Sequence, residues 1–167
     1  TLSAINLPAN ASFADSTTGG GLLTFTPSFS QTGVYDVSII ASDGSLADTQ
    51  IVTFYVGNVN RPPVLAAIGS KSVNEVSLLS FTVSASDPDG TTATFTTSTL
   101  PTGATFTDNG NGTGAFSWTP TYSQSGNYFI TFRASDGILI DTEIVAVTVN
   151  NVNRKPVLAA VSALSVN

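Results

Sequence analysis

The chain contains no cysteine and no histidine among its 167 residues, and only 10% of its residues are charged. Without cysteine there is neither a disulfide framework nor a thiol nucleophile, although this does not fix the compartment. Without histidine, imidazole metal sites and the usual nucleophile–base pairs are excluded. Carboxylates and amides are the groups left for binding chemistry, and we therefore expect a protein that is not an enzyme.

Methionine and long apolar runs are also missing. No stretch is apolar enough for a signal peptide or a membrane span, so we expect the sequence to continue on both sides, with any export signal and anchor outside it. The net charge of −6 argues against nucleic acid, which requires a basic face, and fits divalent cations or plain solubility equally well.

A repeat organises what is present. Residues 58–65 read Asn-Val-Asn-Arg-Pro-Pro-Val-Leu, and residues 151–158 repeat this with one substitution, 93 residues further on. At this spacing the two parts align without a gap and about half of the positions are identical. We predict a complete repeat at 61–153, the last two-thirds of a preceding repeat at 1–60, and the opening strand of a following repeat at 154–167.

β-branched and aromatic residues, punctuated by Gly, Asn and Asp, indicate strands, and no helical periodicity is present. In the partial repeat, no strand is assigned before Gly21. The complete repeat predicts about seven strands that form an all-β, Greek-key sandwich, with Trp118 and Phe116 between the sheets and a tyrosine-corner bond from Tyr128. The expected strands are 21–26, 33–42, 49–56, 64–67 with 70–73, 79–85, 93–97, 104–107, 115–118, 127–135 and 145–149.

The order of short motifs along the complete repeat is distinctive. It runs Asn-Glu (74–75), Asp-Pro-Asp-Gly (87–90), Leu-Pro-x-Gly-Ala (100–104), Trp-Thr-Pro (118–120), Gly-Asn-Tyr (126–128) and Ala-Ser-Asp-Gly (134–137), before the Asn-Val-Asn-Arg linker. This order resembles the cadherin-like and immunoglobulin-like tandem repeats of bacterial surface proteins, namely the dystroglycan-type cadherin-like and putative-Ig families. The resemblance implies an extracellular or cell-surface location.

Asp87 and Asp89 lie two residues apart on an extended segment, a spacing that suits chelation of a hard cation such as calcium. The cadherin resemblance implies the remaining ligands, Asn58 and Asn60 from the linker and Asp136 from a late strand end. Where cadherin linkers carry further acids, this linker has Val56, Gly57 and Val59, so we expect about one ion per junction. Glu75 is a secondary candidate that would face the next linker, with Asn151 and Asn153. The competing interpretation is that these aspartates serve only their turns.

The predicted function is a structural or adhesive extracellular array, a stiff stalk or fibre. Its expected partners are neighbouring repeats of the same chain, other copies in a fibre, and a cell-surface or glycan ligand. One alternative is a filament subunit assembled from several copies by strand donation, because residues 1–60 lack opening strands and residues 154–167 offer one. Another is a glycan-binding or enzyme-appended module, for which Tyr122 and Phe29 are the candidate aromatic platforms. Apolar runs that could span a membrane are absent from the sequence.

Overall fold

The computed structural model describes residues 1–161 and residue 163, and every regular element in this part of the chain is a β-strand. The predicted all-β fold is confirmed. The chain divides into two compact units, Thr1–Asn60 (the first unit) and Arg61–Asn167 (the second unit). None of the described residues belongs to a helix that could cross a membrane.

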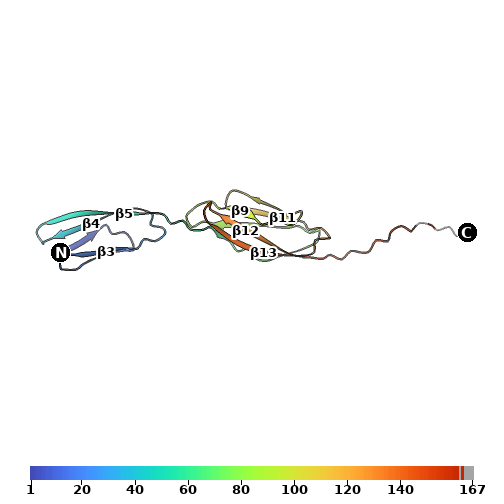
Figure 1. The fold of residues 1–167 in the computed structure, drawn as a ribbon, viewed down its shortest axis with the longest axis horizontal. Coiled ribbons are helices and arrows are strands. Elements are labelled where there is room, and N and C mark those ends of the chain that lie inside the picture. Colours follow the sequence, from blue (N-terminus) through green and yellow to red (C-terminus); the bar gives the residue numbers. More distant parts are fainter. Residues whose placement is uncertain (162, 164–167) are drawn as a thin grey trace. The chain divides into compact units, whose positions relative to one another are not determined.

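The second unit is a β-sandwich of two four-stranded sheets (Figure 1). One sheet has the order β10-β11-β8-β6 and the other β7-β13-β12-β9. All pairings are antiparallel except that of β7 with β13. Its strands are β6 (Val64–Leu65), β7 (Lys71–Asn74), β8 (Leu79–Ser86), β9 (Thr94–Thr97), β10 (Thr105–Asp108), β11 (Thr113–Trp118), β12 (Gly126–Ser135) and β13 (Ile140–Asn150).

The core of the second unit lies between these sheets and follows from the alternation along the strands. In β12, Ile130, Phe132 and Ala134 are at most 1% exposed, while the residues between them face outward, as the period of two requires. Trp118 and Phe116 are each 1% exposed, so the predicted core aromatics are confirmed. These rings pack at edge-to-face or stacked angles, an arrangement that adds to the energy of burial.

Tyr128 makes the predicted back-bond to the main chain. Its hydroxyl donates to the carbonyl oxygen of Gln124 over 3.0 Å, and its ring packs edge-to-face with that of Trp118, with centroids 4.8 Å apart. The same bond recurs in the first unit, where the Tyr35 hydroxyl donates to Gln31 over 3.1 Å. Each bond anchors the loop that enters a long central strand.

The first unit repeats part of this architecture. β1, β4 and β5 form one sheet and β2 pairs with β3, and each pairing has a counterpart in the second unit. The pair Gly33↔Val56 becomes Gly126↔Val149, and the whole β4–β5 register recurs in β12–β13 at the same shift. Counterparts of β6, β7 and β8 do not occur among residues 1–60. Its strands are β1 (Leu2–Ile5), β2 (Ala11–Asp15), β3 (Gly21–Phe25), β4 (Gly33–Ser42) and β5 (Ala47–Val56).

Some sequence-based boundaries need correction. The sequence predicts no strand before Gly21, yet β1 and β2 both lie there. β13 begins at Ile140, five residues before the predicted start at 145. The described residues 154–161 form no strand in this chain. The rest of the predicted opening strand at 154–167 includes residues 162 and 164–167, which lie outside the described residues.

Candidate functional site

The Asp-Pro-Asp-Gly segment closes β8 with a tight turn. The Gly90 amide donates to the Asp87 carbonyl oxygen over 3.1 Å, and Gly90 has a φ of +86°, where a side chain would be strained. The Asp87 Oδ1 atom accepts from the Asp89 amide over 2.7 Å, which is the Asx bond that such turns favour. The turn therefore presents two carboxylates next to the beginning of the second unit, where Arg61 lies.

Arg61 holds the Asp89 carboxylate with three hydrogen bonds. Its backbone amide donates to Oδ2 over 2.6 Å, and its Nε and Nη2 atoms donate to Oδ1 over 3.0 and 2.7 Å. The side-chain hydrogen bond from Arg61, followed by its backbone hydrogen bond, lowers the pKa of Asp89, while burial and the nearby Asp136 charge act in the opposite direction. The Asp89 side chain is only 9% exposed and that of Arg61 is 31% exposed, so this ion pair is partly shielded from solvent.

The remaining predicted carboxylates have different environments. Asp136 lies in the β12–β13 turn, where its Oδ1 accepts from the amides of Ile138 and Leu139 over 2.7 and 2.6 Å. The Oδ2 atom of Asp87 is buried and has no hydrogen-bond partner. Oδ1 of Asp136 therefore stabilises the turn, as expected if these aspartates serve only their turns. Oδ2 of Asp87, in contrast, needs a hydrogen-bond partner that the described residues do not supply.

The predicted calcium ligands are not gathered into a ready-made cage. Among the described residues, no group of three or more acidic side chains is close enough to hold a metal ion. Asp136 lies close enough to Asp89, within the second unit, for its charge to act against the lowering of the Asp89 pKa. Asn58 is exposed and Asn60 is half-buried at the end of the first unit. The assignment of calcium to these five residues therefore remains a prediction.

Glu75 is the buried acid at the opposite end of the second unit. It is 2% exposed and follows β7, and its backbone amide donates to the Asn150 carbonyl oxygen over 3.0 Å. Its Oε2 atom accepts from the Val152 amide over 2.8 Å, whereas Oε1 is buried without a partner. Glu75 and Asp87 carry the two buried side-chain oxygens that lack hydrogen bonds in the described part of the chain. The sequence makes Glu75 only a secondary candidate, because it would face the next junction, whose further partners lie outside the given residues. Its burial could not be predicted from an acid that follows a short strand.

The aromatic platform proposed at Tyr122 is partly covered. The Arg154 guanidinium lies over its ring, 4.3 Å from the centroid, and the side chain is 41% exposed. This is cation–π geometry, which ties the second linker to the second unit. The other platform candidate, Phe29, is 59% exposed. Arginine occurs at the same position of both linkers, as Arg61 and Arg154. This repetition is the sequence signal that could have predicted the contacts of Arg61 with Asp89 and of Arg154 with Tyr122.

Comparison with known proteins finds one family and one curated relative. The profile of the Putative Ig domain family matches residues 62–150, which is more than half of the chain. Chitinase A from Pseudoalteromonas piscicida is 35% identical over 66 residues, which are 38% of this chain and 8% of the chitinase. This chain thus corresponds to a small part of that enzyme.

Solved structures include two that cover most of this chain. An endo-fucoidan hydrolase from glycoside hydrolase family 107 aligns over 90% of this chain and 24% of its own, with 23% identity and a TM-score of 0.48. Domains 4 and 5 of the S-layer protein SbsC align over 89% of this chain and 69% of their own, with 21% identity and a TM-score of 0.42.

Proposed function

The chain belongs to the Putative Ig domain family, and we propose that it is a non-catalytic extracellular spacer whose repeats are joined by calcium-stiffened linkers. A spacer has to hold a separation, so the chain must leave each sandwich in a fixed direction. The contacts of the second unit with its two flanking linker segments support this role. Neither contact requires a substrate or a reactive group.

The linker contacts act at both ends of the second unit. Arg61 is fixed to the Asp89 turn through its backbone and its side chain. The following residues Pro62 and Pro63 restrict φ, and Pro63 is fully buried. At the other end, Val152 is bonded to buried Glu75. The conformational freedom of the linker is therefore reduced where it meets the sandwich, as a stiff spacer needs.

Two buried carboxylate oxygens without a hydrogen-bond partner carry the calcium proposal. One belongs to Asp87 and the other to Glu75, at opposite ends of the second unit. An ionised oxygen that is buried without a hydrogen bond is costly, and a hard cation would supply the missing partner. Because Arg61 already neutralises Asp89, binding would depend most on the Asp87 and Asp136 carboxylates. Amide oxygens of Asn58 and Asn60 would complete about one site per junction.

The test is thermal unfolding of the 167-residue chain in chelator and in calcium. A ligand that binds only the folded state at about 100 times its dissociation constant adds about 2.7 kcal/mol. We expect calcium to raise the melting temperature, Asp87→Asn to abolish the rise, and Asp36→Asn to preserve it, since Asp36 is an exposed residue of the first unit. An identical melting temperature in chelator and calcium would return the aspartates to their turn roles.

The match to a chitinase sequence favours a second candidate, a spacer module appended to a polysaccharide hydrolase. In this arrangement the module separates a catalytic domain from other parts of its enzyme. Co-sedimentation of the chain with insoluble chitin distinguishes a pure spacer, which stays in the supernatant, from a binding module, which is depleted. If it is depleted, Tyr122→Ala and Phe29→Ala identify the platform.

A further inference from the structure

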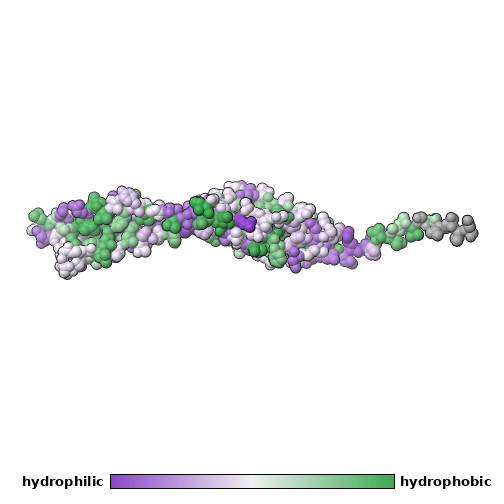
Figure 2. Space-filling model, in the orientation of Figure 1, coloured by the Kyte–Doolittle hydropathy of each residue, from purple (hydrophilic) through white to green (hydrophobic). Residues whose placement is uncertain are grey.

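The loop between β10 and β11 of the second unit contains two Asn-Gly pairs in succession. Residues 108–113 read Asp-Asn-Gly-Asn-Gly-Thr, and both Asn109 and Asn111 are exposed. Pale and purple colours, those of Gly, Ser, Thr and Asn residues, cover much of the second unit in Figure 2. In an Asn-Gly pair the backbone nitrogen of the glycine can attack the side-chain carbonyl of the asparagine, because no side chain shields it. Both pairs have this chemistry, so a difference between them must come from the fold.

The Thr113 hydroxyl is aimed at the side chain of Asn111. The Nδ2 atom of Asn109 donates to the Thr113 Oγ1 atom over 2.9 Å. The hydroxyl in turn donates to Oδ1 of Asn111 over 2.6 Å. A donor at a carbonyl oxygen stabilises the negative charge that develops there when a nucleophile adds. The fold therefore activates the side-chain carbonyl of Asn111 towards attack.

The backbone amides that follow the two asparagines also differ. The Gly110 amide donates to Oδ1 of Asp108 over 3.0 Å, and this bond must break before the nitrogen can turn towards Asn109. Within the described part of the chain, the Gly112 amide makes no hydrogen bond. Gly112 has a φ of +77°, which favours glycine at this position. The nucleophile next to Asn111 is therefore available, whereas the one next to Asn109 is held.

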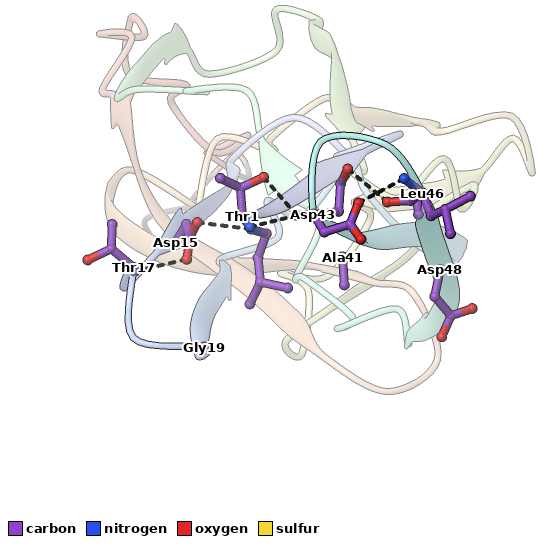
Figure 3. Close-up of a pocket in the computed structure, with 11 residues that line it drawn as sticks. Thr1, Asp15, Thr17, Gly19, Ala41, Asp43, Leu46 and Asp48 are labelled. Carbon is purple, nitrogen blue, oxygen red and sulfur yellow. Dashed lines mark hydrogen bonds between the residues drawn. The ribbon is translucent and has the colours of Figure 1, made fainter.

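The corresponding loop of the first unit closes in the same way without asparagine. Oδ1 of Asp15 accepts from the Thr17 amide over 2.9 Å (Figure 3), and Asp108 makes the same bond to the amide two residues after it. The two asparagine positions are occupied here by Ser16 and Thr18. Because this loop forms with Ser and Thr, the turn itself does not require the two asparagines of the second unit.

We propose that Asn111 is a self-modification site, at which the chain converts its own amide to a carboxylate. Solvent base removes the proton of the Gly112 amide, and the nitrogen forms a bond to Cγ of Asn111. The bond between Cγ and Nδ2 then breaks, and Nδ2 takes up a proton and leaves as ammonia. Water opens the cyclic imide at either carbonyl, which leaves an aspartyl or an isoaspartyl residue at position 111. This reaction goes beyond the spacer function and does not depend on it.

The modification changes the surroundings of the end of β8. The Gly112 carbonyl oxygen accepts from the Ala85 amide over 3.1 Å. An isoaspartyl residue adds a methylene to the main chain immediately before Gly112, so this bond is disturbed. We expect the Ala85 amide to exchange its hydrogen faster in the modified chain. Ala85 lies two residues before Asp87, so the reaction loosens the strand that leads into the Asp-Pro-Asp-Gly turn.

The experiment is peptide mapping by mass spectrometry of the 167-residue chain, incubated in neutral and in mildly alkaline buffer. We expect Asn111 to gain the mass of the carboxyl product at least about tenfold faster than Asn109, and faster as the pH rises. In denaturant the two asparagines should react at similar rates, because their sequence neighbours are equivalent. Equal rates at both positions in the folded chain would overturn the proposal.

Variants separate the activation of Asn111 from simple exposure of the loop. Thr113→Val removes the donor and should slow the reaction by about tenfold, while Thr113→Ser keeps the hydroxyl and should keep the rate. Asn111→Gln retains an amide but places its carbonyl one methylene further from the Gly112 nitrogen. After the same incubation, this variant should show the Ala85 exchange of the fresh chain. A rate that Thr113→Val leaves unchanged or raises would refute the assigned role of the hydroxyl.

Discussion

Truncation of Glu75 should loosen the second linker and destabilise the second unit. Glu75→Ala removes the acceptor of the Val152 amide, a bond to a charged group worth about 1.5–3 kcal/mol. It also removes a buried methylene, worth about 0.8 kcal/mol. Loss of the unpartnered Oε1 oxygen offsets part of this cost. We expect a net loss of about 2 kcal/mol, which lowers the melting temperature of a unit of this size by roughly 8 °C.

The assay follows from the composition of the chain. Trp118 is its one tryptophan and is buried in the second unit, so its fluorescence reports the unfolding of that unit alone. Glu75→Gln is the matched control, because the amide oxygen can still accept from Val152 without burying a charge. Measured in chelator, Glu75→Gln should unfold within about 0.5 kcal/mol of the unaltered chain. If Glu75→Ala unfolds at the same temperature as Glu75→Gln, the bond to Val152 does not hold the linker.

Three further predictions concern packing and charge. Gly114→Ala should destabilise the second unit by about 1–3 kcal/mol in denaturant unfolding, because the added Cβ would overlap the partly buried ring of Phe106. Val145→Ala should cost about 2 kcal/mol and Val52→Ala clearly less, because the first side chain is 1% and the second 39% exposed; hydrogen exchange can measure both units separately. Hydrogen bonds from Arg61 lower the pKa of Asp89 in the folded state, so the stability they contribute is present above about pH 4 and is lost as the pH falls through the folded pKa. Arg61→Gln should therefore make acid unfolding, followed by tryptophan fluorescence, less steep.

The sequence predicts the strands with long alternation better than the short ones. β4 has the predicted bounds, because ten residues of alternation end at an Asp-Gly turn. β1 and β2 have only four and five residues, too few for a period of two to stand out. They were nevertheless recoverable, since β9 and β10 lie one repeat further on and were predicted there. Applying the repeat in both directions would have found them.

The candidate site was less accessible to sequence reasoning. Asp87 and Asp89 look equivalent in an Asp-Pro-Asp-Gly motif, yet Asp89 is paired with an arginine 28 residues earlier, whereas Asp87 keeps an unpartnered oxygen. Such a difference depends on which loop faces which carboxylate, and local sequence does not encode that. The burial of Glu75 is a similar case, because it results from two segments 77 residues apart.

The central claim is that calcium stiffens the linker between the repeats. The chain has no cysteine, so spin labels can be attached selectively at Thr26→Cys and Thr82→Cys, two exposed positions in different units. The distance distribution between the labels, measured by pulsed electron resonance, should be narrower in calcium than in chelator. In Asp87→Asn it should stay broad in both conditions. A distribution of the same width with and without calcium in the otherwise unaltered chain would contradict the claim.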